Sequence, residues 1–172
     1  MWSNYLLCIL LLICVITDLK GRKIYNAVLF PCLLVALILN TITGGLHGLL
    51  EALLGTVVGL GILLIPYLFG GMGAGDVKLL AVIGGIKGMG FVLMASLYMA
   101  FAGGIMAILI FLFHKGIKRR LTQILYFLHG LRNGMRLSLL QDKEAMKTTY
   151  PYGVAIAVGA LYQVFRTVGL PQ

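Results

Sequence analysis

The sequence predicts an all-α membrane protein with about six transmembrane helices, and three observations carry that prediction. Hydrophobic residues make up 60% of the 172 residues and charged residues only 11%, whereas soluble domains have about half and about a quarter. The mean hydropathy is +1.02, and the apolar residues form long runs without the period-two alternation of a barrel. Backbone polar groups must be paired internally within the hydrocarbon, so we expect each run to be a helix.

Six apolar runs are candidate spans, because roughly 20 helical residues cross a bilayer core about 30 Å thick. The fourth run is short: its ten residues cover only about 15 Å as a helix. We expect it either to continue through the neighbouring glycines or to begin below the membrane surface, with Asp76 at the mouth of a water-reached cavity. No repeat, linker or low-complexity segment divides the chain, so we expect one domain over residues 1–172. The runs are 2–17, 24–43, 49–69, 77–86, 89–113 and 150–169.

The positive charges predict the orientation. A net charge of +9 could suggest nucleic-acid binding, but the fourteen Lys and Arg residues lie mostly in the segments between the apolar runs. Twelve of them fall on one side of six alternating spans, and only Lys87 and Arg166 fall on or near the other side. Cytoplasmic loops are enriched in Lys and Arg, so we expect an inner-membrane protein with its N-terminus outside and Asp18, Asp76 and residues 114–149 in the cytoplasm. We expect no nucleic-acid partner.

The long segment between the fifth and sixth runs has an amphipathic pattern. Over residues 117–140, apolar side chains recur at helical spacing between basic ones. This pattern favours a basic helix lying on the anionic inner leaflet of the bilayer, as a surface element without a catalytic part.

The cysteines give no sign of a metal or disulfide framework. Cys8, Cys14 and Cys32 each lie inside an apolar run, and the sequence has neither a CxxC pair nor a Cys/His cluster. We therefore expect no metal and no cofactor. The N-terminus lacks the basic start and small-residue cleavage site of a secretory signal, so we expect the first span to be retained.

Two of the five acidic residues are candidates for chemistry. Asp142 and Glu144 lie in the polar segment, and solvation or snorkelling explains Glu51 near the outer end of the third run. Asp18 ends the first run and Asp76 opens the fourth, so the expected topology puts both at cytoplasmic helix ends, where they can converge. Two carboxylates held close tend to share one proton and can act as general base and general acid toward water attacking a peptide carbonyl. This chemistry needs neither a metal nor a covalent intermediate.

The glycines of the stretch GGMGAGDVKLL, residues 70–80, allow the backbone to bend sharply and another chain to approach closely. An acid at the start of the following helix is stabilised by the helix dipole. The same glycines also suit a tight interhelical loop without a function.

Three motifs together resemble the type IV prepilin peptidases, membrane aspartic proteases of the GxGD type. The central motif is MGAGDVKLLAVIGGIKG at 72–88, preceded by DLKGRKIYN at 18–26 and followed by YPYGVAIAVGAL at 150–161. The resemblance implies that Asp18 and Asp76 are the catalytic aspartates. It implies a helical membrane fold, with the three motifs at the cytoplasmic ends of the first, fourth and sixth spans.

The resemblance also assigns supporting residues. Gly73 and Gly75 occupy the glycine positions of GxGD, and Lys78 follows where the family has a lysine. We leave open whether Lys78 shapes the catalytic charge or anchors to lipid headgroups, and we favour the anchor.

The end of the first motif and the start of the last motif also match the family, except at Tyr25. Asn26 matches the asparagine that ends the first motif, but Tyr25 stands where proline is common, so the next helix could enter at another angle. Pro151 and Gly153 match the start of the last helix, where proline suits the first turn.

Larger bacterial members of the family carry a cytoplasmic domain with paired CxxC motifs, associated with N-methylation of the mature pilin. This chain has neither the cysteines nor the length for such a domain, so it resembles the short form that serves tight-adherence (Flp-type) pili. The resemblance implies a peptidase without methyltransferase activity. Its partners would be prepilin-like membrane proteins, cleaved after a short leader that typically ends in glycine, together with the bilayer itself.

Two other classes of function stay open from the sequence. A small transporter or channel could use Asp18 and Asp76 to relay protons or bind a cation, although such proteins tend to keep polar residues deep in several spans. A non-catalytic assembly factor of a pilus or secretion machine would give the two acids no purpose. A presenilin-like protease is disfavoured by the span count and by the position of Asp18 in a D-x-K-x-R turn.

Overall fold

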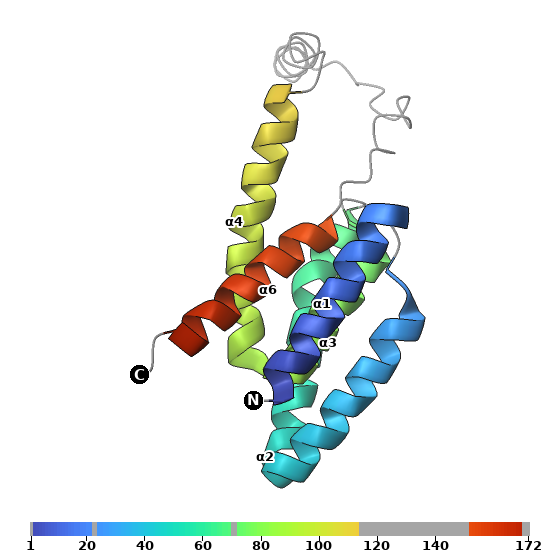
Figure 1. The fold of residues 1–172 in the computed structure, drawn as a ribbon, viewed down its shortest axis with the longest axis vertical. Coiled ribbons are helices and arrows are strands. Elements are labelled where there is room, and N and C mark those ends of the chain that lie inside the picture. Colours follow the sequence, from blue (N-terminus) through green and yellow to red (C-terminus); the bar gives the residue numbers. More distant parts are fainter. Residues whose placement is uncertain (1, 22–23, 70–71, 114–151, 170–172) are drawn as a thin grey trace, which may run out of the picture. The chain divides into compact units, whose positions relative to one another are not determined.

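The computed structural model describes residues 2–21, 24–69, 72–113 and 152–169, and in these ranges the regular elements are all α-helices (Figure 1). They confirm the predicted all-α class. The helices are α1 (Trp2–Gly21), α2 (Asn26–Leu68), α3 (Ala74–Lys87), α4 (Met89–Phe113) and α6 (Tyr152–Gly169). The amphipathic segment expected at 117–140, together with Gly70, Gly71 and Pro151, lies outside the described residues.

The chain divides into two compact units. The first comprises residues 1–103 and 150–172, and the second comprises residues 104–149, of which the structure describes the last part of α4. The single domain over residues 1–172 stays a prediction.

Long apolar helices bear out the prediction of a membrane protein. Three helical stretches are long and apolar enough to cross a bilayer: Trp2–Gly21, Asn26–Leu68 and Met89–Met106. Many of their large apolar side chains face outward, including Leu46 (78% exposed) and Phe101 (72% exposed). An outward face of this kind suits lipid. The number of crossings and their direction remain predictions.

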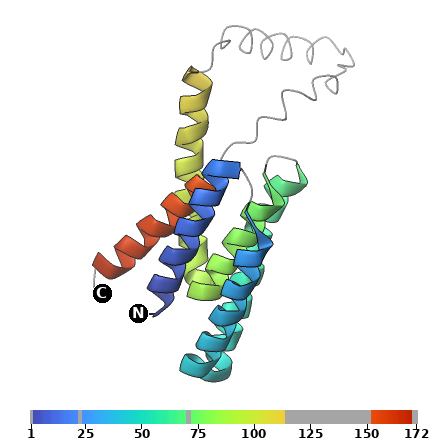
Figure 2. The same cartoon turned by 45° about the vertical axis from the view of Figure 1, so that its right-hand side comes forward.

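Helix α2 combines two of the predicted spans. Its 43 residues are helical except at Gly45, whose φ of 59° and ψ of −144° break the helix, and the helix folds back there (Figures 1 and 2). Only glycine adopts such a conformation without strain. The expected loop at residues 44–48 is therefore reduced to one residue, which separates a first arm (26–44) from a second arm (46–68).

Three other boundaries differ from the predicted ones. Helix α1 continues to Gly21, so Asp18 lies within a helix rather than in a turn. Helix α3 starts at Ala74 and has 14 residues, which gives it a length of about 21 Å. The expected loop between α3 and α4 is the single residue Gly88, with a φ of 85°. Apolar periodicity locates helices but not the residue at which each one stops.

Helix α3 is the centre of the first unit, and ten of its 14 residues are buried. It packs against α1, α2 and α6. Close approach to the second arm of α2 depends on glycine, because a Cβ on Gly55 would overlap the carbonyl of Gly84, and one on Gly84 would overlap that of Gly55. Gly59, four residues later, lies against the Leu80 carbonyl, 2.5 Å from where its own Cβ would be. This is the small-xxx-small packing of membrane helices.

Candidate active site

Asp18 occupies the end of the buried face of α1. Leu7, Leu11 and Cys14 precede it on that face at spacings of three or four residues and are buried as well. Helical periodicity therefore turns the Asp18 side chain inward, where it is 6% exposed. This carboxylate is therefore a buried one, although it lies near the end of its helix.

Asp76 is the third residue of α3 and is 8% exposed. The Gly73 N–H donates to Asp76 Oδ2 at 3.3 Å, and the Asp76 N–H donates to the Gly73 carbonyl at 3.1 Å. Two N–H groups at the helix start are thus used by this pair; because the N-cap residue is glycine, only the half of a capping box in which the third residue accepts from the N-cap N–H is present. The dipole of α3 also favours a negative charge at this end of the helix.

The fold brings these two carboxylates together from positions 58 residues apart in the sequence. They are close enough that the charge of Asp18 acts on Asp76. Both groups are buried, and ionising both at once is unfavourable because each charge lacks bulk water and repels the other. The pair is therefore suited to hold one proton between two carboxyl groups.

Gly153 lets α6 approach the Asp18 carboxylate closely. A Cβ at that position would lie 2.6 Å from Asp18 Oδ2 and 3.1 Å from Asp18 Cγ, so only glycine leaves the carboxylate room. Gly75 plays a similar part on α3, where a Cβ would lie 2.9 Å from the Cβ of Ile24. Glycines from two separate motifs thus permit close contacts around the carboxylates.

The first and second motifs are also joined by a hydrogen bond. Lys78 Nζ donates to Asn26 Oδ1 at 3.1 Å, which ties the start of α2 to α3. Tyr25, which caps α2, has a φ of −84° and a ψ of 127°. Proline fixes φ near −65°, so the tyrosine keeps a backbone close to the one that proline would impose. Pro151 lies outside the described residues.

Within the residues that the structure describes, no three His, Cys, Asp or Glu side chains come together in a group that could hold a metal ion.

Two glycines that allow close packing on α3 were not singled out from the sequence. Gly55 and Gly59 let the second arm of α2 approach α3 closely, and α3 carries Asp76. Their signal was present in the sequence as a GxxxG spacing at 55–59 within an apolar run.

A second polar region lies at the other end of α3. A cavity of about 310 Å³ is lined there by Glu51, Lys87, Asn40 and Thr43 among others. Lys87 Nζ donates to Asn4 Oδ1. Glu51 is exposed, as the sequence predicted for a solvated acid.

Comparison with known proteins identifies a family. A model of the type IV leader peptidase family matches residues 5–108, which include α2, α3, both aspartates, Gly73, Gly75 and Lys78. No curated protein and no solved structure matches the chain.

Proposed function

The chain belongs to the type IV leader peptidase family, and we propose that it is an aspartic endopeptidase in which Asp18 and Asp76 form the catalytic dyad. Its substrates are prepilin-like membrane proteins, cleaved after a short N-terminal leader at the cytoplasmic face of the inner membrane. The observation that carries the proposal is that two buried carboxylates, one on α1 and one on α3, lie within electrostatic reach of each other. The family match over both of them supports it.

The proposed reaction uses the shared proton. The ionised carboxylate takes a proton from water, whose oxygen attacks the carbonyl carbon of the scissile peptide bond, while the protonated carboxyl gives its proton to the carbonyl oxygen. The tetrahedral intermediate then collapses with cleavage of the C–N bond, and a proton from the dyad passes to the leaving amine. One water is consumed and no metal takes part.

The residues around Asp18 and Asp76 position the two carboxylates, and the membrane positions the substrate. Gly153 lies beside the Asp18 carboxylate, and Gly73 holds Asp76 through its N–H group. A substrate whose apolar helix is already inserted beside the protein needs only local adjustment to bring its scissile bond to the dyad, which lowers the entropic cost of the reaction.

The test is co-expression with a candidate prepilin-like protein, with leader loss followed by gel shift and N-terminal sequencing. We expect the wild type to cleave after the leader glycine, Asp76→Asn to leave the substrate uncut, and Glu51→Gln to cleave as the wild type does. All variants must be present in the membrane in equal amounts. Full processing by Asp76→Asn would refute the dyad.

Two finer parts of the proposal need their own measurements. The 172 residues contain no CxxC pair, so the new N-terminus is expected to be unmethylated, and a mass increase of one methyl group that depends on this enzyme would contradict that.

The orientation is supported by the distribution of Lys and Arg. In a Cys8→Ser background, an impermeant thiol reagent outside the cell should label Thr43→Cys and not Gly21→Cys. The reverse pattern would overturn the orientation.

A further inference from the structure

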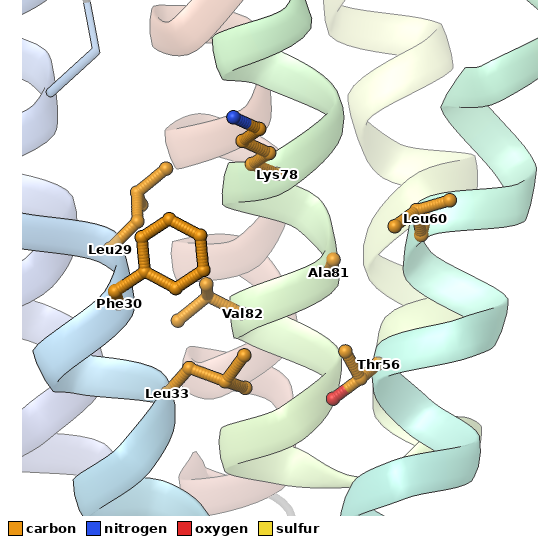
Figure 3. A pocket seen from close by; sticks show the side chains of 8 residues that line it. All are labelled: Leu29, Phe30, Leu33, Thr56, Leu60, Lys78, Ala81 and Val82. Carbon is orange, nitrogen blue, oxygen red and sulfur yellow. The ribbon is translucent and has the colours of Figure 1, made fainter. Parts of the chain in front are cut away.

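An apolar groove lies along α3 between the two arms of α2 (Figure 3). It encloses about 190 Å³. Phe30 and Leu33 of the first arm face Leu60 of the second arm across Ala81 and Val82 of α3.

The interior of the groove suits an apolar chain. Its one hydroxyl group, on Thr56, is already used, because Oγ1 donates to the Ala52 carbonyl at 2.8 Å. The groove is closed near Gly85, where a Cβ would lie 2.7 Å from both Leu33 Cδ1 and Thr56 Oγ1. An occupant therefore extends toward the other end, where Lys78 lies.

Lys78 places a positive charge at that end. Its ammonium donates to the neutral amide of Asn26 at 3.1 Å and lies 6.0 Å from the centre of the Phe30 ring. In the part of the chain that the structure describes, no carboxylate forms an ion pair with Lys78. An ammonium has three donors, so at least one is left for an anionic group.

The groove is separate from the carboxylate pair. Successive residues are turned by about 100° around the helix axis. Seen along that axis, Lys78 therefore projects about 160° from Asp76, and Gly85 about 180° from it. The groove thus faces the opposite side of α3 from Asp76. A peptide held at Asp18 and Asp76 would not lie in it, so the groove needs a different occupant.

We propose that this groove binds an anionic phospholipid, with the headgroup phosphate on Lys78 and part of one acyl chain along Ala81 and Val82. The charge at one end and the apolar walls match such an amphiphile. The stretch from Lys78 to Gly85 is about 10 Å long, within the roughly 15 Å of hydrocarbon in one leaflet. Phe30 and Leu60 on its rim are 57% and 40% exposed, so a chain can enter sideways from the bilayer. The site does not depend on the proposed peptidase activity.

The first test measures lipid binding to the purified full-length protein by native mass spectrometry. Phosphatidylglycerol and phosphatidylcholine of the same chain length are titrated in detergent. We expect one phosphatidylglycerol to bind roughly fivefold more tightly than phosphatidylcholine, since a lysine near an anionic headgroup contributes about that factor. Lys78→Gln should remove this preference. Lys87→Gln, at the other end of the same helix, should keep it, and an unchanged preference in Lys78→Gln would overturn the proposal.

The second test locates the acyl chain. Phosphatidylglycerol with a photoreactive group in one acyl chain should crosslink to α2 near Leu60 or to α3 near Val82. Leu60→Trp fills the groove from its rim and should reduce both crosslinking and tight binding, whereas Leu64→Trp, one turn further along and outside the groove, should not. Crosslinks confined to other surfaces, equal effects of the two tryptophans, or displacement of the lipid by a substrate-derived apolar helix would refute the lipid site.

Discussion

The two ends of α3 carry similar chemical groups and differ in how these are enclosed. At the Asp76 end, carboxylates on α1 and α3 lie within electrostatic reach of each other and are 6% and 8% exposed. At the Lys87 end, the Glu51 carboxylate is exposed beside a polar cavity, and Lys87 is hydrogen-bonded to Asn4. Water stabilises an exposed carboxylate in its ionised form, whereas two buried carboxylates favour sharing one proton. Burial and pairing therefore distinguish a candidate catalytic end from a solvated one.

The largest expected difference between the ends is in cleavage. Asp18→Asn removes one member of the buried pair without changing its size, so under the proposed function the rate of leader cleavage should fall by roughly three orders of magnitude or more. Glu51→Gln makes the same chemical change at the other end and should alter the rate by less than about twofold. Single-turnover cleavage in membranes with matched enzyme amounts measures both. Equal losses in the two variants would remove the functional distinction between the ends.

One glycine lies beside an acidic residue at each end of α3. Substitution of the first should lower activity, and substitution of the second should lower stability. Gly153→Ala puts a Cβ 2.6 Å from Asp18 Oδ2 and so displaces the carboxylate, which should lower kcat roughly 10- to 100-fold in folded enzyme.

Gly88→Ala acts near Glu51, whose Oε2 would lie 3.3 Å from the new Cβ, at a residue with a φ of 85°. It should cost about 1–2 kcal/mol of unfolding free energy through backbone strain and leave kcat of the folded fraction unchanged. Thermal unfolding and kcat, measured on the same preparations, test both variants. Loss of kcat in folded Gly88→Ala would show that the Lys87 end affects the chemistry.

The class of fold and the two candidate acids could be predicted from the sequence, because both follow from composition and from short motifs. The all-α class and the exposed Glu51 were predicted correctly, and Asp18 and Asp76 were selected as a pair from their positions at the ends of apolar runs. The continuation of α1 past Asp18 was missed, since the charged residues after Asp18 suggested a turn, although Lys20 lies within the helix. Burial of Asp18 depends on α6 approaching at Gly153, a tertiary contact that no local pattern specifies.

The glycine contact between the second arm of α2 and the middle of α3, called the seam below, lies between the two ends of α3. A substitution there should have an intermediate effect on stability. Gly55→Ala places a methyl group against the Gly84 carbonyl, so α2 and α3 must move apart, which we expect to cost about 1–3 kcal/mol. Gly61, six residues along the same arm, has nothing within 4 Å of its Cβ position. Gly61→Ala should therefore be neutral or stabilising by up to about 1 kcal/mol. Equilibrium unfolding in mixed micelles measures both, and equal stabilities would show that the seam is not closely packed.

The smallest effect is expected from the interhelical hydrogen bond at the Lys87 end. Asn40 Nδ2 donates to the Gly85 carbonyl of α3 at 3.1 Å and to Ala36 of its own helix at 3.0 Å. Hydrogen bonds between membrane helices average about 0.6 kcal/mol, so Asn40→Ala should lower the unfolding free energy by about that amount without changing cleavage. Thr43→Ala is the matched control, because its hydroxyl is exposed and donates within its own arm, to Leu39 at 2.8 Å. It should leave stability unchanged. A large loss of cleavage in Asn40→Ala alone would mean that the Lys87 end of α3 helps to hold Asp76 in place, and the two ends would then have to be treated as one site.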